Sequence, residues 1–409
     1  MNKFLKEFKD RGFFYQCTNE NDLSKLLDKE KINGYIGFDC TAESLHVGSL
    51  LQIMCLRLLQ KHGHRPIVLL GGGTTRIGDP SGKDKTRAIL NEKEIEKNIK
   101  NIEKILKNFL DIKNPKTKPI FVNNYSWLKN LNYISFLRDI GKHFTINKML
   151  SFDSVKTRLE REQSLSYMEF NYMILQAYDF LELNKKKNCI LQMGGSDQWG
   201  NIVNGVELIK RYSNKQAYGL TTPLITLASG AKMGKTESGA VWLDKKYLSP
   251  YDYWQFWRNI DDRDVLRFLK IFTDLSVDEI ENIKNDDVNK LKIVLANKAT
   301  SLLHGKKEAK ASEDTAKKTF SENSLGSGLP LISINKKKLK EELNIIDLIV
   351  LSKLETSKSE IRRLIKGNGI KINNQIINND KLTITEDLFQ NNLIKLSIGK
   401  KRHMKVMLT

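Results

Sequence analysis

The stretch YIGFDCTAESLHVGSL at residues 35–50 decides the fold that we expect for this chain. Its first five residues read as a buried strand that ends at Asp39, and a short loop with Thr41 and His46 then leads into a helix that begins near Gly48. A strand followed by a helix in this way is the unit of a parallel sheet. The helix N-terminus would gather backbone N–H groups and the His46 imidazole into an anion site, with a purely structural histidine as the alternative.

Further β-rich runs alternate with helix-like stretches up to about residue 247. They are RPIVLLGGG (65–73), KPIFVNN (118–124) and CILQMGG (189–195). Because these runs are apolar on both faces, we predict an α/β catalytic domain at 1–247, built on a Rossmann-like parallel sheet.

The signals from 248 to 320 predict an α-helical domain. Ser249, followed by proline, is typical of a helix start, and Ser276 with Glu279 has the spacing of a capping box. The aromatic run YDYWQFW at 251–257 favours the core of a helical bundle over a surface on which bases stack.

A linker is predicted at 321–342, where the Ser/Gly-rich SENSLGSGLP begins, and a small α+β RNA-binding module at 343–409. Residues 331–409 hold 16 basic and 8 acidic side chains. A capping box of Ser357 and Glu360 opens a short helix, GNG ends it, and KINNQII reads as two strands around an Asn-Asn turn. Such a module suits the phosphates of folded RNA, with a solvated basic face as the alternative. The RNA-binding candidates are Arg362, Arg363 and Lys366.

The composition is that of a globular chain, with 40% hydrophobic and 28% charged residues among 409. No apolar run approaches the length of about 18 residues that a membrane span needs, and the start MNKFLKEFKDRGFF resembles neither a signal peptide nor an organellar leader. The four cysteines lack metal-ligand or disulfide spacing, so we expect no metal site and a cytoplasmic protein. The net charge of +20 favours a polyanionic partner, unless it only reflects a genome that encodes many Lys and Asn residues.

Two common nucleotide fingerprints fail in this sequence. GGGTTR ends at Arg76, where a dinucleotide-binding GxGxxG needs its last glycine, which argues against a dehydrogenase. The following GDPSGKDKTR (78–87) misses the Walker A spacing and has no Ser or Thr after Lys83. This loop instead offers Asp79 to an ammonium group, and Lys83 and Arg87 to phosphates.

Three later segments add polar groups of the same kind. In FNYMILQAYDF, Tyr172, Gln176 and Asp179 share one stripe of an apolar helix, either as the lining of a pocket or as an ordinary exposed face. MGGSDQWGN follows a strand and offers a carboxylate to ribose hydroxyls. LASGAKMGKTESG carries two lysines that can follow a pyrophosphate as its charge develops.

Gly48, in the first stretch, has no side chain, so a flat ring such as adenine can lie against its backbone.

The segments YIGFDCTAESLHVGS, GDPSGKDKTR, YMILQAYD, GGSDQWGN and KMGKT, in this order, resemble those of the bacterial-type tyrosyl-tRNA synthetases, which are class I aminoacyl-tRNA synthetases. The resemblance runs over nearly the whole chain, with HVGS similar to the HIGH motif and KMGKT to the KMSKS motif. It implies an enzyme that forms tyrosyl-adenylate from L-tyrosine and ATP, and then transfers tyrosine to the 3′ end of tRNA(Tyr). It also implies a homodimer with contacts around residues 130–165, where internal core is the alternative. Mg²⁺ is expected with ATP, without a dedicated protein site.

The resemblance implies a role for each candidate residue. The phenol of the substrate would be held by Tyr35 and Asp179, its α-ammonium by Asp79, Tyr172 and Gln176, and its carboxylate by Gln198. The adenosine site would comprise Gly37, Asp39, Gly48, Gly195, Asp197 and Met233. The phosphates would be met by Thr41, His46, Lys83, Arg87, Lys232, Lys235 and Thr236.

Two positions depart from the family pattern. Ser49 stands where HIGH has its second histidine, so contacts to adenine there are open, and a Ser49 that merely caps the helix is the alternative. Gly234 replaces the serine of KMSKS, which indicates that backbone mobility and the flanking cations matter more than a hydroxyl. Because the carboxylate of tyrosine is already a nucleophile, positioning and charge stabilisation should dominate the first step.

Two rival interpretations remain at this point. A tryptophanyl-tRNA synthetase is disfavoured by Tyr35 and Asp179, because an indole offers an N–H donor but no hydroxyl. An RNA-binding protein built on a synthetase scaffold is disfavoured by the complete set of catalytic-type residues.

Overall fold

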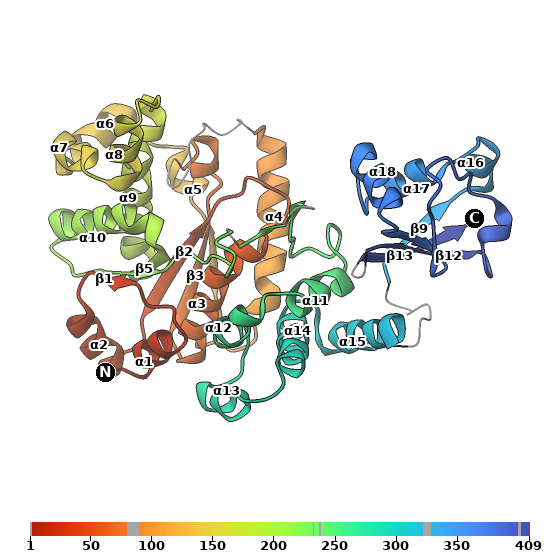
Figure 1. Cartoon of the computed structure of the whole chain (residues 1–409). Coiled ribbons are helices and arrows are strands. Elements are labelled where there is room, and N and C mark those ends of the chain that lie inside the picture. Colours follow the sequence, from red (N-terminus) through yellow and green to blue (C-terminus); the bar gives the residue numbers. More distant parts are fainter. Residues whose placement is uncertain (1, 80–89, 232, 237–238, 322–328, 400–401) are drawn as a thin grey trace. The chain divides into compact units, whose positions relative to one another are not determined.

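The computed structural model describes residues 2–79, 90–231, 233–236, 239–321, 329–399 and 402–409 (Figure 1). The chain divides into two compact units by its internal contacts. The first comprises Met1–Gly234, Val241–Asp244 and Ile260–Leu291, and the second comprises Lys235–Ala240, Lys245–Asn259 and Lys292–Thr409. This grouping differs from boundaries at 247, 320 and 342, which stay predictions.

A six-stranded sheet organises the first unit, in the order β1-β6-β5-β2-β3-β4. Its strands are β1 (Gln16–Cys17), β2 (Asn33–Phe38), β3 (Arg65–Leu70), β4 (Ile120–Asn123), β5 (Cys189–Gly195) and β6 (Tyr218–Thr222). All neighbours pair in parallel except β1, which runs antiparallel to β6 at one edge. The four strands expected from sequence are therefore confirmed as β2 to β5, and the Rossmann-like parallel sheet is confirmed.

Helices cover both faces of this sheet. The helices of the first unit are α1 (Lys3–Asp10), α2 (Glu20–Lys29), α3 (Leu50–Lys61), α4 (Glu92–Phe109), α5 (Tyr125–Leu128), α6 (Tyr133–Asp139), α7 (Ile146–Leu150), α8 (Asp153–Glu160), α9 (Tyr167–Lys187), α10 (Trp199–Ser213), α12 (Val265–Phe272) and α13 (Val277–Ile283). On β2, the ring of Tyr35 packs on Phe180 of α9, whereas a Cβ on the adjacent Gly34 would lie 2.9 Å from Leu59 of α3. Helices α9 and α3 therefore lie on opposite faces (Figure 1).

Helix α9 is the long apolar helix that the sequence predicts around residues 170–180. It begins with a capping box of Ser166 and Glu169 and ends at Asn188, which adopts the left-handed conformation with a φ of 47°. Its Met173 and Ala177 are buried in one hydrophobic cluster with residues of β2 and β3. This packing fixes the position of every polar side chain that α9 carries toward the sheet.

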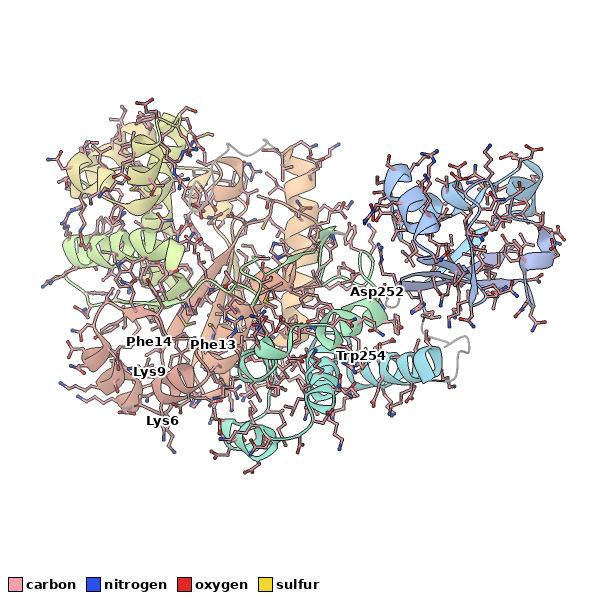
Figure 2. The ribbon with its side chains drawn as sticks, viewed as in Figure 1. Lys6, Lys9, Phe13, Phe14, Asp252 and Trp254 are labelled. Carbon is pink, nitrogen blue, oxygen red and sulfur yellow. The ribbon has the colours of Figure 1, made fainter. Side chains whose placement is uncertain are left out.

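The helical part of the second unit is built around buried aromatic side chains. It contains α11 (Pro250–Arg258), most of α14 (Val288–His304), from Lys292 onward, and α15 (Lys306–Ser321). Ser249 caps α11 by accepting a hydrogen bond from the backbone of Asp252, as expected. Trp254, labelled in Figure 2, is 2% exposed and donates its indole N–H to Oδ1 of Asn297 at 2.7 Å. The aromatic run is thus helix core, as predicted, and the capping box of Ser276 at α13 is also confirmed.

The C-terminal part of the second unit is a five-stranded sheet with three short helices. The sheet has the order β11-β10-β12-β13-β9. Its elements are β9 (Leu331–Ile334), α16 (Lys336–Lys340), α17 (Ile345–Ser352), α18 (Lys358–Lys366), β10 (Ile370–Ile372), β11 (Gln375–Ile376), β12 (Leu393–Ile398) and β13 (Arg402–Leu408). The expected Asn-Asn turn is present, because Asn373 and Asn374 both have positive φ between β10 and β11. A separate hairpin pairs β7 (Lys235–Thr236) with β8 (Gly239–Ala240).

The predicted capping box of α18 is only half formed. The Ser357 hydroxyl accepts from the backbone of Glu360 at 3.4 Å, as a capping residue should. The Glu360 carboxylate, however, binds the guanidinium of Arg363 at 2.8 and 2.6 Å, and the backbone N–H of Ser357 donates to Glu355. An arginine one turn along the helix therefore competes successfully for the carboxylate that a capping box needs.

Among the described residues, no helix combines the length and the apolarity that crossing a membrane requires.

Candidate active site

The predicted site residues of the first unit gather at the carboxyl ends of its parallel strands. Gly37 and Asp39 lie at the end of β2, and Gln198 follows β5 in a short 3₁₀ turn. Asp79 follows the end of β3 after another such turn. In open parallel sheets this edge is where ligands bind, because the loops there can vary without disturbing the sheet.

Tyr35 and Asp179 form a buried polar pair below this edge. Each is 1% exposed, and Tyr35 lies in the middle of β2 while Asp179 lies on α9. The Tyr35 hydroxyl has no hydrogen-bond partner among the described residues. Burial, and then the nearby Asp179 carboxylate, raise the pKa of Tyr35 well above its ordinary value. A buried hydroxyl without a hydrogen-bond partner lowers the stability of the fold. This position is therefore suited to a polar group of a ligand that would bond to the hydroxyl.

Two donors hold the Asp179 carboxylate. Its Oδ1 accepts from the indole N–H of Trp127 at 2.7 Å, and its Oδ2 accepts from the amide of Asn124 at 2.9 Å. Burial raises the pKa of Asp179 to about 7, although both hydrogen bonds favour the charged form. Near neutral pH the carboxyl group is therefore close to the midpoint of its titration.

Asn124 and Trp127 are site residues that the sequence reasoning misses. Asn124 is fully buried, and its amide also donates to the Thr74 hydroxyl at 2.9 Å, while its Oδ1 accepts from the backbone of Gly73 at 2.7 Å. One side chain thus joins the ends of β3 and β4 to Asp179 on α9. The available signal was the polar end of the strand KPIFVNN, which reaches the ligand-binding edge of the sheet.

A second polar network lies at the same edge. The Asp79 carboxylate accepts from the Gln198 amide at 2.9 Å, and Gln198 Oε1 accepts from the Gln176 amide at 3.2 Å. Asn201 on α10 donates to Gln176 Oε1 at 3.1 Å and to Gln198 Oε1 at 3.2 Å. Asn201 is also missed from sequence, although it lies one helical turn after Gln198. Tyr172 is 5% exposed on the same face of α9 as Gln176.

The HVGS and KMGKT segments touch each other. A Cβ added to Gly48 would lie 2.9 Å from the backbone oxygen of Met233, and one added to Gly234 would lie 2.8 Å from Nδ1 of His46. Val241 links the two segments further, since its backbone oxygen accepts from the N–H of Val47 at 2.9 Å and its N–H donates to the backbone oxygen of Gly234 at 3.1 Å. Gly234 has a φ of +113°, a conformation that side chains rarely adopt. The missing serine of KMSKS is explained, because neither the backbone nor the space beside His46 admits a side chain here.

His46 has a defined tautomer in this arrangement. Its Nδ1 accepts a hydrogen bond from the backbone N–H of Gly48 at 3.0 Å, at the start of the 3₁₀ turn Val47–Ser49. The neutral ring must then carry its proton on Nε2, which makes Nε2 a donor. Ser49 precedes α3 but forms no side-chain capping bond, so the expectation that it caps the helix is wrong. The His46 ring instead caps the preceding 3₁₀ turn, through its bond from Gly48.

The remaining candidates fall into three groups. Gly37 and Thr41 are exposed, Asp39 is half-buried, and Asp197 is exposed beside the buried Gly195. Lys83, Arg87 and Lys232 lie outside the described residues. The residues of the second unit are Lys235 and Thr236, whose backbone forms β7, and Arg362, Arg363 and Lys366, which are exposed on α18.

Leu224 is another position that the sequence reasoning does not single out. Its side chain is 59% exposed, and it lies 3.5 Å from where a Cβ on Gly195 would be. An exposed leucine beside a glycine backbone offers an apolar surface next to Asp197. Among the described residues, no group of three or more His, Cys, Asp or Glu side chains is arranged to hold a metal ion.

Comparison with known families agrees with this geometry. Residues 27–321 match the class I tRNA synthetases (W and Y), and residues 322–406 match the C-terminal domain of SYY-like tyrosine–tRNA ligases. A tyrosine–tRNA ligase of Pelagibacter ubique (strain HTCC1062) is 82% identical over 408 residues, covering 100% of both chains. One from Wolbachia sp. subsp. Brugia malayi (strain TRS) is 55% identical over 412 residues, covering 100% of this chain and 99% of that protein.

Solved structures of the same kind share the fold. The C-terminally truncated mitochondrial tyrosyl-tRNA synthetase of Aspergillus nidulans is 32% identical and has a TM-score of 0.70, covering 78% of this chain and 94% of that one. The Archaeoglobus fulgidus tyrosyl-tRNA synthetase, complexed with L-tyrosine, has a TM-score of 0.56 over 76% of this chain and 99% of that one, at 17% identity. The chain belongs to the class I tRNA synthetases and, within them, to the tyrosine–tRNA ligase family.

The contact between the two motifs can be tested at Gly234. Gly234→Ala should strain the backbone and push a methyl group against His46, whereas Gly230→Ala at φ +82° should strain the backbone alone, since nothing lies within 4 Å. We expect both variants to lose about 1–3 kcal/mol of stability. On the expectation that His46 meets a phosphate of ATP, only Gly234→Ala should weaken ATP binding, by about tenfold, because it displaces the imidazole. Thermal unfolding measures the loss of stability, and calorimetric titration measures the affinity for ATP. Equal ATP affinity in both variants would contradict the expected role of His46 in ATP binding.

Proposed function

We propose that this chain activates L-tyrosine with ATP to tyrosyl-adenylate and pyrophosphate, and then transfers tyrosine to the 3′ end of tRNA(Tyr) for protein synthesis. The observation that carries this proposal is the buried pair of Tyr35 and Asp179. The Tyr35 hydroxyl lacks a partner in the part of the chain that the structure describes, and the Asp179 carboxylate is near the midpoint of its titration at neutral pH. Such a pair matches a phenol, which both donates and accepts a hydrogen bond.

Recognition of the phenol follows from these two groups. The substrate hydroxyl would donate to Asp179 and accept from Tyr35, so that both buried groups become satisfied. Phenylalanine would leave the Tyr35 hydroxyl unpaired and would give Asp179 no donor beyond Asn124 and Trp127. Its rejection then needs no separate editing site. An indole would supply a donor to Asp179 but no acceptor for Tyr35. This difference favours tyrosine over tryptophan as the substrate.

The amide network would hold the amino-acid end of the substrate. Asp79 supplies the negative charge that an α-ammonium group requires, and its bond from Gln198 fixes its orientation. Asn201 donates to both glutamine oxygens, which holds the amides of Gln176 and Gln198 in one arrangement. Tyr172 would complete the ammonium site, and Gln198 would lie near the carboxylate. A pre-arranged network of this kind costs little reorganisation when the substrate arrives.

The nucleotide would lie along the edge formed by HVGS, KMGKT and the end of β5. Its adenosine would rest on the glycine backbones, with Leu224 beside the ring and carboxylates near the ribose; the residues proposed are Gly37, Asp39, Gly48, Gly195, Asp197 and Met233. His46 would donate from Nε2 to a phosphate oxygen, together with Thr41. The cations proposed for the pyrophosphate are Lys83, Arg87, Lys232 and Lys235, with Thr236, and Mg²⁺ would accompany ATP.

The chemistry asks for position and charge stabilisation rather than for a base. The substrate carboxylate attacks the α-phosphorus, the bond to the bridging oxygen breaks, and pyrophosphate leaves with the negative charge. Cations and N–H donors around the leaving group stabilise that charge, and each such contact is typically worth about 10²–10³ in rate. In the second step a ribose hydroxyl of the tRNA attacks the tyrosyl carbonyl, and AMP leaves.

The protein would work in the cytoplasm.

The second unit would bind the tRNA. Arg362, Arg363 and Lys366 are exposed on α18 and are the proposed phosphate contacts there. Two of them already have acidic neighbours, since Glu360 binds Arg363 and Asp380 lies 3.8 Å from Arg362. RNA would have to compete with these carboxylates.

The chain would work as a homodimer through α6, α7 and α8. These helices lie together in the first unit (Figure 1) and expose large apolar side chains. The exposed fractions are 57% for Tyr133, 69% for Ile134, 60% for Ile146 and 48% for Leu159. The alternative of internal core is therefore not supported for these side chains. Apolar groups gathered in this way favour burial against another protein surface.

Isotope exchange between ATP and pyrophosphate tests the activity. We expect exchange with purified protein to require L-tyrosine, because only a bound phenol satisfies both Tyr35 and Asp179. Phenylalanine and tryptophan should give rates at least about 100-fold lower at equal concentration, since each leaves a buried group unpaired. Exchange that proceeds equally well with either of them would refute the proposed specificity.

The titration of Asp179 predicts a pH dependence of tyrosine affinity. The phenol donates to the ionised carboxylate, and the pKa of Asp179 in the free chain is about 7. Affinity should therefore rise by about tenfold from pH 6 to pH 8, since binding must release the proton that the free carboxyl group still holds. Equilibrium titration with L-tyrosine across this range measures the effect.

Two variants make this test specific. Asp179→Asn should weaken binding and remove the pH dependence. Glu182→Gln should move the midpoint to lower pH, because the Glu182 charge helps to raise the pKa of Asp179. A pH profile that is unchanged in Asp179→Asn would assign the titration to another group.

The proposed dimer predicts that one charge on the apolar surface prevents association. Ile134→Glu should give a monomer, because burying an unpaired carboxylate between two chains is costly. Ile112→Glu is the matched control, since Ile112 is 42% exposed but lies outside these helices. Light scattering after size-exclusion chromatography gives the masses. A dimer in Ile134→Glu would place the association surface elsewhere.

A further inference from the structure

Strand β2 ends just before the loop that carries proposed nucleotide contacts. Its last residue, Phe38, accepts a hydrogen bond from the backbone N–H of Gly71 at 2.9 Å. Cys40 lies two residues further along and is fully buried, so its own backbone N–H and oxygen still need partners. The proposed contacts Asp39 and Thr41 are the direct neighbours of Cys40 in the chain. Whatever holds the backbone of Cys40 therefore determines where both contacts lie.

Two side chains hold the backbone of Cys40. Its N–H donates to Oγ1 of Thr75 at 2.9 Å, and its oxygen accepts from the amide of Asn98 at 2.9 Å. Thr75 is 6% exposed in the 3₁₀ turn Thr74–Arg76 that follows β3, and Asn98 is 4% exposed in α4. Both bonds are therefore shielded from water. We call Thr75 and Asn98 the Cys40 clamp.

Asn98 is a polar exception on the buried face of α4. The other buried residues of this helix are all apolar, namely Ile95, Ile102, Ile105, Leu106 and Phe109. An amide at such a position gives up hydration, which its hydrogen bond to Cys40 replaces only in part. Polar exceptions of this kind are expected where a function requires them, so the role of Asn98 concerns the loop that it holds.

The turn that carries Thr75 also contacts the surroundings of Asp179. The hydroxyl of Thr74 accepts from the amide of Asn124, and the same amide donates to the Asp179 carboxylate. The turn is closed by its own backbone, because the N–H of Thr75 donates to the oxygen of Gly71 at 2.7 Å. Two adjacent threonines thus bond to the phenol end of the site and to the nucleotide loop. One short turn therefore fixes these two parts relative to each other.

We propose that Thr75 and Asn98 are positioning residues for the activation of tyrosine. The inference rests on the function proposed above and adds two residues to it. Neither side chain would touch a substrate, because both act through the backbone of Cys40 on its neighbours Asp39 and Thr41. The two substrates bind to different segments, so the attack on the α-phosphorus depends on how precisely those segments are placed. A misplacement of about 1 Å can cost about 100-fold in rate.

A purely structural role is the alternative, and Gln60 of α3 provides a matched comparison. The Gln60 amide donates to the backbone oxygens of Asp111 and Thr117, and its Oε1 accepts from the N–H of Asp111. Gln60 is 8% exposed, so it holds a backbone segment by buried side-chain bonds as the Cys40 clamp does. It lies in the last turn of α3, whereas the HVGS segment precedes the first turn.

Substitutions in the full-length chain separate the two roles. T75V and N98L each remove one bond of the Cys40 clamp, T75S keeps the hydroxyl, and Q60M is the matched control. Tyrosine-dependent exchange between ATP and pyrophosphate is measured over ranges of both substrates. Equilibrium titration with L-tyrosine and thermal unfolding are measured on the same samples. Because T75V and N98L remove different bonds, the test does not depend on the folding of one variant.

We expect T75V and N98L to lower the maximal exchange rate by about 10-fold to 100-fold, because the nucleotide loop loses its placement. Their affinity for tyrosine should stay within about twofold of normal, since the phenol end of the site is unchanged. The double variant T75V/N98L should lose about as much as either single variant, because both residues hold the same backbone segment. T75S should exchange at nearly the normal rate. Q60M should unfold at a lower temperature, as T75V should, yet exchange normally.

Three results would overturn the inference. One is a maximal exchange rate of T75V and N98L equal to that of Q60M, which would make the Cys40 clamp purely structural. Another is a loss of tyrosine affinity as large as the loss of rate, which would assign the effect to Thr74 and the phenol end of the site. The third is a T75S variant as slow as T75V. An unmodified chain that fails to exchange pyrophosphate with tyrosine would instead refute the proposed function, and the inference would fall with it.

Discussion

The buried carboxylate of Asp179 is the constraint on which the site depends. An anion can be buried only where donors replace the water that it loses. Here Asn124 and Trp127 supply them from the segment after β4, and Asn124 is itself tied to Thr74 after β3. The segments after β3 and β4 must therefore assemble with α9 before this carboxylate is satisfied. The surroundings of Asp179 therefore form only when several segments of the Rossmann-like domain fold together, and no single loop provides them.

This arrangement has a cost for folding. The pKa of Asp179 is about 7 in the folded chain and 3.8 in the reference state, so the folded chain holds the proton more tightly. The stabilisation that the protonated group contributes is complete below the lower value and is lost as pH rises through 7. Near neutral pH the fold thus keeps a carboxylate at a position that an apolar residue would fill more stably. A functional role accounts for such a group better than a structural one does.

The elements of the fold were predictable because their signals are local. Strands β2 to β5 are short apolar runs, and α9 is a long apolar helix with a capping box at Ser166. Tyr35 and Asp179 were also identified, since they belong to motifs. Asn124, Trp127 and Asn201 were not, because their roles depend on which strand ends meet, and this is decided by the order of strands in the sheet. The expected role of Glu360 failed because the neighbouring Arg363 binds its carboxylate, whereas Ser49 forms no side-chain bond to the start of α3.

The exposed apolar side chains of α6 to α8 have a consequence beyond assembly. If a second copy covers them, the free energy of folding includes the free energy of association, and it then depends on protomer concentration. Dilution would lower the melting temperature without any change in sequence or solvent. A cell that makes little of this protein would therefore hold a less heat-resistant form of it than a cell that makes much.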